Sequence, residues 1–144
     1  HVMPKPGYQA FLEELAKDPM QSQVLKPGLG FDPEVVFEID LKPDVDGLAH
    51  ALQKHPEGFS DYISFRPDQA PLAMQWICRT EDQDGLGMAF PSTSGVEGYA
   101  AEKTKGRVVE LTGGKTWRIN MLMGHLTALE TDKAIATIDA IREP

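Results

Sequence analysis

Carboxylates, an aromatic ring and many small polar residues gather in a single stretch, STSGVEGYAAEKTKGRVVEL, at residues 92–111. Glu97 and Glu102 lie in this stretch between two apolar runs, a setting in which a carboxylate can act as a general acid or base. A solvated charged loop has the same composition, because carboxylates are abundant in an acidic chain. We therefore interpret residues 92–106 as a strand-to-strand loop at the rim of a sheet, with Glu97 as the one weak catalytic candidate.

The side chains in and around this loop have the composition of a sugar site. Carbohydrates are bound by an aromatic face beneath their C–H groups and by polar side chains around their hydroxyls. The predicted ligand-binding residues are Trp76, Arg79, Thr93, Glu97, Tyr99 and Lys103. Phe90 and Trp117 also lie near predicted strand ends. Both tryptophans could instead be core residues, because large aromatic side chains are highly buried on average.

Metal, phosphate and nucleophile motifs do not occur in the sequence. The four histidines, His1, His50, His55 and His125, lack the spacing of a zinc site, and we expect His50 and His55 at the surface or at strand ends. The turn EDQDG at residues 81–85 lacks the alternate acids and the distal glutamate of an EF-hand. Glycine-rich phosphate loops and a nucleophile elbow are also missing. The sequence therefore predicts neither a metal nor a cofactor.

The single cysteine, Cys78, cannot form an internal disulfide. Its place in an apolar alternation predicts a buried, inert thiol. A chain without disulfides fits a reducing compartment, and we expect a cytoplasmic protein.

The charge balance excludes two classes of partner. The chain has 22 acidic and 14 basic residues and a net charge of −8. This field repels phosphate backbones and anionic membrane surfaces, so we expect no nucleic-acid and no membrane partner. No run approaches the ~20 apolar residues of a membrane helix.

Helical spacing occurs near both ends of the chain. Apolar residues at this spacing predict an amphipathic helix at residues 8–18, followed by Pro19. Isoleucines three residues apart predict a second helix at residues 131–143, with Thr131 near its N-cap.

Extended segments separated by turns fill the region between the two helices. The predicted strands are residues 35–41, 59–66, 72–80, 86–91, 107–111 and 116–126. Residues 48–55 fit either a short helix or a strand, and TGGK at residues 112–115 is a hairpin-type turn. Because no β-α-β alternation occurs, we expect a mainly β fold, an antiparallel β-sandwich with N- and C-terminal helices.

The predicted organisation is a short N-terminal part and one domain. Residues 1–3 resemble the remnant of an expression tag. We therefore assign the tag remnant and the first helix to residues 1–19, and a single β-sandwich domain with its C-terminal helix to residues 20–144.

Residues 71–119 resemble the C-terminal part of the galactose mutarotase-like, or aldose 1-epimerase-like, superfamily, and the likeness extends over about residues 33–125. The features that carry it are the strand with Trp76 after a proline-containing turn, PST at 91–93, GYAAEKTKG at 98–106 and LTGG at 111–114. The resemblance implies a supersandwich, or half of one, whose concave face binds carbohydrate. It also implies exchange of sugar anomers by a glutamate base and a histidine acid.

The chain departs from this family in ways that affect its predicted function. Family members are considerably longer, and the position that matches their base holds Phe90, which cannot accept a proton. None of His50, His55 and His125 matches a family motif. These departures predict that the chain alone lacks mutarotase activity, unless Glu97 from the same loop replaces the base. The predicted function is therefore a protein that binds or weakly epimerises a small sugar.

The alternative function is a non-catalytic assembly module. Half a sandwich would leave sheet edges and an apolar face uncovered. A homo-oligomer, a complementary chain or a terminal helix would cover them, and we expect one of the first two.

Overall fold

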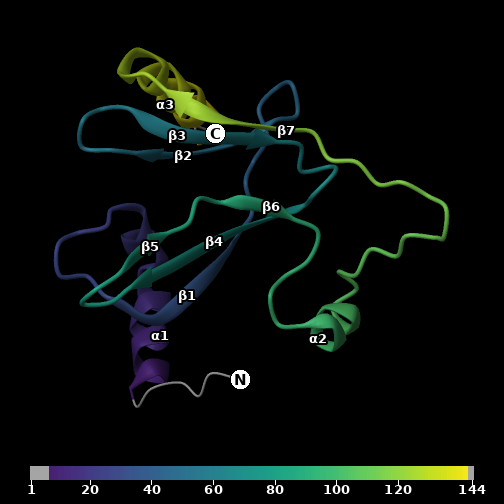
Figure 1. Ribbon diagram of the computed structural model, residues 1–144, viewed down its shortest axis with the longest axis horizontal. Helices are drawn as coiled ribbons and strands as arrows, with labels where there is room; N and C mark the ends of the chain where they lie inside the picture. The colour runs from purple at the N-terminus through teal and green to yellow at the C-terminus, as the bar shows by residue number, and fades with distance from the viewer. Residues whose placement is uncertain (1–6, 143–144) are drawn as a thin grey trace. The chain divides into compact units, whose positions relative to one another are not determined.

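The computed structural model describes residues 7–142, apart from the side chains of residues 19 and 33. The tag-like residues 1–3 lie outside this range. The helices are α1 (Tyr8–Lys17), the 3₁₀-helix η1 (Pro19–Gln23), α2 (Tyr99–Thr104) and α3 (Ala128–Arg142). The strands are β1 (Phe31–Ile39), β2 (Ala49–Lys54), β3 (Ser60–Phe65), β4 (Leu72–Arg79), β5 (Asp84–Leu86), β6 (Phe90–Ser92) and β7 (Met121–Leu126). The predicted mainly β class with terminal helices is confirmed (Figure 1).

The strands form two antiparallel sheets. One sheet has the order β2-β3-β7, and the other has the order β1-β4-β5, with β6 also paired to β4. Ala49 and Phe65 of the first sheet pack in one buried cluster with Ala73 of the second and with Ala89. This apolar contact between sheet faces is the packing expected of a β-sandwich.

Two compact units divide the chain. The first contains residues 7–35 and 76–86, and the second contains residues 36–75 and 87–142. In the first unit, the Phe11 and Phe31 rings meet edge to face, with 6.0 Å between ring centres. The second unit contains the whole β2-β3-β7 sheet and α3.

The terminal helices confirm the predicted periodicity, but the N-cap of α3 was predicted wrongly. The helix begins at Ala128 because Thr127 and Glu130 form a capping box. Glu130 Oε2 accepts hydrogen bonds from the Thr127 amide and hydroxyl, at 2.8 and 2.7 Å. Thr131 lies inside the helix and is fully buried, with its hydroxyl 2.8 Å from that of Ser60.

The predicted strand at residues 86–91 is broken, because β5 and β6 pair with different parts of β4. Gly85 pairs with Cys78, whereas Pro91 pairs with Ala73. The ambiguous segment, residues 48–55, forms strand β2. Cys78 itself is half-buried, not buried.

The predicted strand at residues 107–111 is not formed. Residues 107–120 have no regular secondary structure, and β7 begins only at Met121. The predicted turn is present, with the Lys115 amide donating to the Thr112 carbonyl at 3.0 Å. Among residues 7–142, no helix has the length and apolar character needed to cross a membrane.

Candidate functional site

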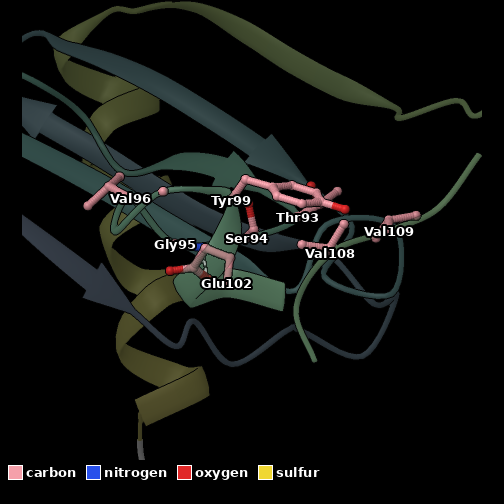
Figure 2. A pocket seen from close by; sticks show the side chains of 9 residues that line it. Thr93, Ser94, Gly95, Val96, Tyr99, Glu102, Val108 and Val109 are labelled. Carbon is pink, nitrogen blue, oxygen red and sulfur yellow. Dashed lines mark hydrogen bonds between the residues drawn. The ribbon is translucent and has the colours of Figure 1, made fainter. Parts of the chain in front are cut away.

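The stretch that the sequence singled out encloses a pocket of about 370 Å³ in the second compact unit. Figure 2 shows the side chains around it. The lining residues are Thr93, Ser94, Gly95, Val96, Gly98, Tyr99, Glu102, Val108 and Val109. The pocket is therefore built from the turn after β6, from α2 and from the chain that leaves α2.

Helix α2 was not predicted, and it changes the interpretation of residues 92–106 as a plain loop. Its core, Ala-Ala-Glu-Lys, consists of good helix formers. Glycines with positive φ angles flank the helix, Gly98 at +94° and Gly106 at +70°, and such angles disfavour other residues. The helix places Tyr99 and Glu102, three residues apart, on neighbouring positions of one side.

Glu102 is the most unusual group of the pocket. The residue is 2% exposed, and its Oε2 atom accepts a hydrogen bond from the Gly95 amide at 2.8 Å. Its Oε1 atom is shielded from solvent and has no hydrogen-bond partner; the Lys105 ammonium is 3.9 Å away. A buried acceptor left without a donor is costly, so it commonly indicates a functional role or an absent partner.

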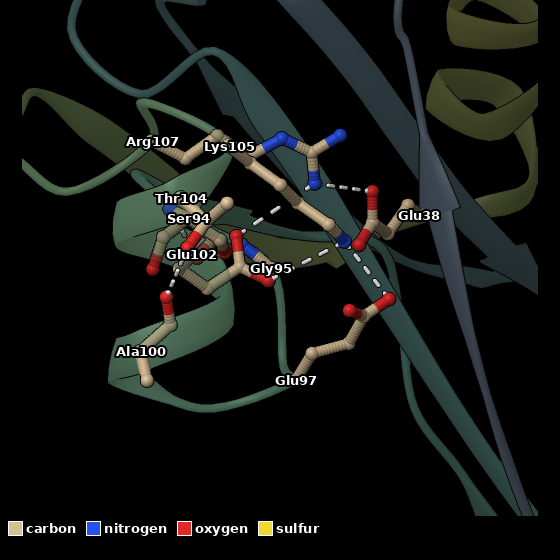
Figure 3. A network of polar contacts seen from close by, with 10 residues as sticks. Glu38, Ser94, Gly95, Glu97, Ala100, Glu102, Thr104, Lys105 and Arg107 are labelled. Carbon is tan, nitrogen blue, oxygen red and sulfur yellow. Dashed lines mark hydrogen bonds and ion pairs between the residues drawn. The ribbon is translucent and has the colours of Figure 1, made fainter.

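Charged side chains surround Glu102 in the network of Figure 3. Arg107 Nη1 donates to Glu38 Oε2 at 2.7 Å and lies 3.8 Å from Glu102 Oε2. Lys105 Nζ lies 2.8 Å from Glu97 Oε1. The hydrogen bond from Lys105 holds the pKa of Glu97 below its usual range, and a lower pKa makes a carboxylate a weaker general base.

Gly95 lies where the part-exposed carboxylate of Glu38 and the buried carboxylate of Glu102 come together. A Cβ atom on Gly95 would lie 2.5 Å from Glu38 Oε1 and 2.7 Å from Glu102 Oε1. Both carboxylates therefore occupy the space above this glycine. A side chain at this position would require the carboxylates to shift.

The structure brings four of the six predicted ligand-binding residues to this region. Thr93 and Tyr99 line the pocket. The Lys103 ammonium lies 5.6 Å from the centre of the Tyr99 ring, a cation–π distance. Glu97 does not line the pocket; it forms an ion pair with Lys105, and its side chain is 58% exposed.

The other two predicted residues, Trp76 and Arg79, belong to the first compact unit. There Arg79 pairs with Asp84 at 2.7 Å and donates to the Lys26 carbonyl at 3.1 Å. These contacts give Arg79 a structural role. The core alternative for the tryptophans was wrong, because Trp76 is 41% and Trp117 is 46% exposed.

Sequence reasoning missed Glu38 and Arg107. Glu38 belongs to β1, 64 positions before Glu102, and nothing in its local pattern connects it to the loop. In the sequence, Arg107 is one of several charged residues in the stretch at 92–111, and nothing distinguishes it from the others. Within residues 7–142, no group of three or more histidine, cysteine, aspartate or glutamate side chains could hold a metal ion.

A second polar cluster holds the turn before β2. His50 Nε2 donates to Asp44 Oδ2 at 3.0 Å, so in its neutral form Nδ1 accepts a hydrogen bond from the Tyr62 hydroxyl at 2.6 Å. Asp44 Oδ1 also accepts from the Leu48 amide at 2.8 Å. The His50 side chain is only 9% exposed, and it lies at the start of β2, which is the strand-end position rather than the surface position of the prediction.

Asp44 makes the stability of the fold depend on pH. Hydrogen bonds from the Leu48 amide and from His50 lower its pKa below the ordinary 3.8. Its contribution is therefore complete above pH 3.8 and is lost as the pH falls through the lower folded-state pKa. We expect Asp44→Asn to destabilise the protein at neutral pH and to flatten its acid unfolding profile.

Thermal unfolding followed across this pH range checks the prediction. Asp40→Asn is the matched control, because Asp40 is exposed in the same unit. Equal pH profiles for the two variants would contradict the role of Asp44.

Comparisons of the chain with protein-family models, with curated proteins and with solved structures found no match. The resemblance of residues 71–119 to the galactose mutarotase-like superfamily therefore stays a prediction. The geometry of the pocket is the main support for any function.

Proposed function

We propose that this chain binds a small neutral sugar in the pocket formed by residues 93–109. The observation that carries the proposal is the buried Glu102 carboxylate, whose Oε1 atom lacks a hydrogen-bond donor. A sugar hydroxyl that reached this atom would supply the missing donor. A hydrogen bond to a charged group contributes about 1.5–3 kcal/mol.

The remaining lining residues fit the other parts of a sugar. The Tyr99 ring is 66% exposed at the pocket and offers an apolar face for C–H groups. Thr93 and Ser94 add hydroxyls that can donate and accept. This mixture of one aromatic face and several polar groups is typical of carbohydrate sites.

Binding is better supported than epimerisation. Glu102 is a better-placed base than Glu97, because it lines the pocket and its Oε1 atom has no hydrogen-bond partner. The reaction also needs a general acid; the histidine that the family resemblance implies for this role is not among the residues that line the pocket. Polarimetric mutarotation of glucose and galactose tests the second function, because a rate equal to that of buffer excludes epimerisation of these sugars.

Saturation-transfer NMR with a panel of monosaccharides tests the proposal through Tyr99. We expect Tyr99→Ala to weaken binding by about tenfold, because aromatic contacts contribute roughly 0.5–1.5 kcal/mol beyond their buried area. The thermal midpoint should hardly change, since the side chain is 66% exposed. Tyr99→Phe, which keeps the ring, should retain the signal. Equal signals from the wild type and Tyr99→Ala would place any sugar elsewhere.

We also propose assembly with another chain as a second candidate function. Met121 and Met123 of β7 lie on the same sheet face as Ile63 and Phe65, which are fully or almost fully buried. The two methionines are nevertheless 45% and 51% exposed. An apolar core face left bare in this way is typical of an interaction surface.

A further inference from the structure

The exposed methionines Met121 and Met123 lie on a strand with a free edge. The face of the β2-β3-β7 sheet that carries them, together with Ile63 and Phe65, is here named the core face. In the described part of the chain, β7 is the last strand of the order β2-β3-β7. Met123 pairs with Ile63, and Met121 pairs with Phe65. The edge therefore has both unpaired backbone groups and uncovered apolar side chains, which is the arrangement that accepts an additional strand.

Residues 108–119, here named the arm, have the character of such a strand. They run without regular structure between α2 and β7, as Figure 1 shows. Val109 and Leu111 are 58% and 57% exposed. When extended, residues two apart point to the same side, so these two side chains match the spacing of Met121 and Met123.

The arm of the same chain cannot cover these methionines by folding back as a hairpin. Its turn, closed by the hydrogen bond between Thr112 and Lys115, sets the register. In that register Leu111 faces Thr116, and the residues opposite Met121 and Met123 would be Gly106 and Thr104. Thr104 belongs to α2, so the edge of β7 needs a strand from elsewhere.

A second copy of the chain supplies a strand of suitable charge. The arm contains two basic residues and one acidic residue, Lys115, Arg118 and Glu110, so its net charge is +1. Because the whole chain has a net charge of −8, the rest of the chain carries −9. The arm of one copy is thus attracted to the acidic body of another. Reciprocal exchange of two arms also gives the closed, two-fold contact that is commonest among homo-oligomers.

We propose that the arm of one copy adds as a strand to β7 of a second copy, with Val109 and Leu111 covering Met121 and Met123. This inference rests on the assembly function proposed above. Because the exchange is reciprocal between two copies, the assembly closes as a dimer.

Light scattering after size exclusion, over a wide range of concentrations, tests the proposal. We expect twice the chain mass of 15.9 kDa for the wild type. Met123→Lys and Val109→Lys should each weaken the dimer by about tenfold or more, because each buries a charge at the contact. Leu122→Lys is the matched control: Leu122 is 62% exposed on the opposite face of the same strand, so this variant should remain a dimer.

The outcomes separate the inference from the function on which it rests. A wild type that stays monomeric at every concentration overturns both. A dimer that persists in Met123→Lys and Val109→Lys overturns the exchange of arms and leaves assembly standing. Equal weakening of the dimer in Leu122→Lys also overturns the exchange of arms, because the loss of affinity would then not depend on which face of β7 carries the lysine.

Discussion

Glu102→Gln is expected to weaken sugar binding by roughly ten- to a hundredfold, since a hydrogen bond to a charged group contributes about 1.5–3 kcal/mol. Glutamine has the size of glutamate, and its carbonyl oxygen can still accept from the Gly95 amide, now at 2.8 Å from the Glu102 carboxylate. The NH₂ group then occupies the place of Oε1. The NH₂ group can only donate, whereas Oε1 of glutamate can only accept, so the sugar hydroxyl loses its charged acceptor.

Calorimetric titration of the wild type and the variant with the best-binding monosaccharide measures this effect. Glu110→Gln is the control, because Glu110 is an exposed carboxylate of the same segment that does not line the pocket. It should bind as the wild type does. An unchanged affinity in Glu102→Gln would remove the basis for the proposed site.

Gly95→Ala is expected to have the second large effect, on stability and binding together. The new Cβ atom would meet Glu38 Oε1 at 2.5 Å and Glu102 Oε1 at 2.7 Å. The part-exposed Glu38 side chain can move aside, but the buried Glu102 carboxylate would also have to shift, and overpacking of a buried group costs about 1–3 kcal/mol. Glu102 would also lose its alignment with the Gly95 amide, so the pocket should bind sugar more weakly.

Gly113→Ala provides the comparison for this variant. A Cβ atom on Gly113 would meet nothing within 4 Å. The substitution there therefore changes only the conformational entropy of the unfolded chain. Chemical denaturation of both variants gives the difference in unfolding free energy. Equal stabilities for the two alanine variants would show that the carboxylates are not confined above Gly95.

Local patterns in the sequence predicted the elements that carry their own signal. Helix α1 followed from apolar residues at helical spacing, and β3 and β4 followed from their extended, turn-bounded segments. The start of α3 was missed although Thr127 and Glu130 have the spacing of a capping box. Thr131 is also a threonine, so its side chain could equally cap a helix. Only the structure shows that it is buried against Ser60 instead.

Residues 107–111 show what local pattern cannot supply. Arg-Val-Val-Glu-Leu has the composition of a strand, yet a strand also needs a neighbour with which to pair. No strand of the described chain pairs with it, and the segment is irregular. The same absence of a neighbour leaves β7 with a free edge.

The candidate site was predicted in part. Glu102, Thr93 and Tyr99 were visible because small and polar residues cluster around them. The burial of Glu102 could not be predicted, since it depends on α2 and on how the residues around Gly95 fold against it. Long-range contacts of this kind have no signature in the local order of residues.

The most direct measurement of the central claim is an amide ¹H–¹⁵N titration of the wild type with monosaccharides. The proposed sugar site predicts concentration-dependent shifts of the Gly95, Tyr99 and Glu102 amides, because these residues surround the free carboxylate oxygen. No shifts at any sugar concentration, or shifts confined to the first compact unit, would contradict it.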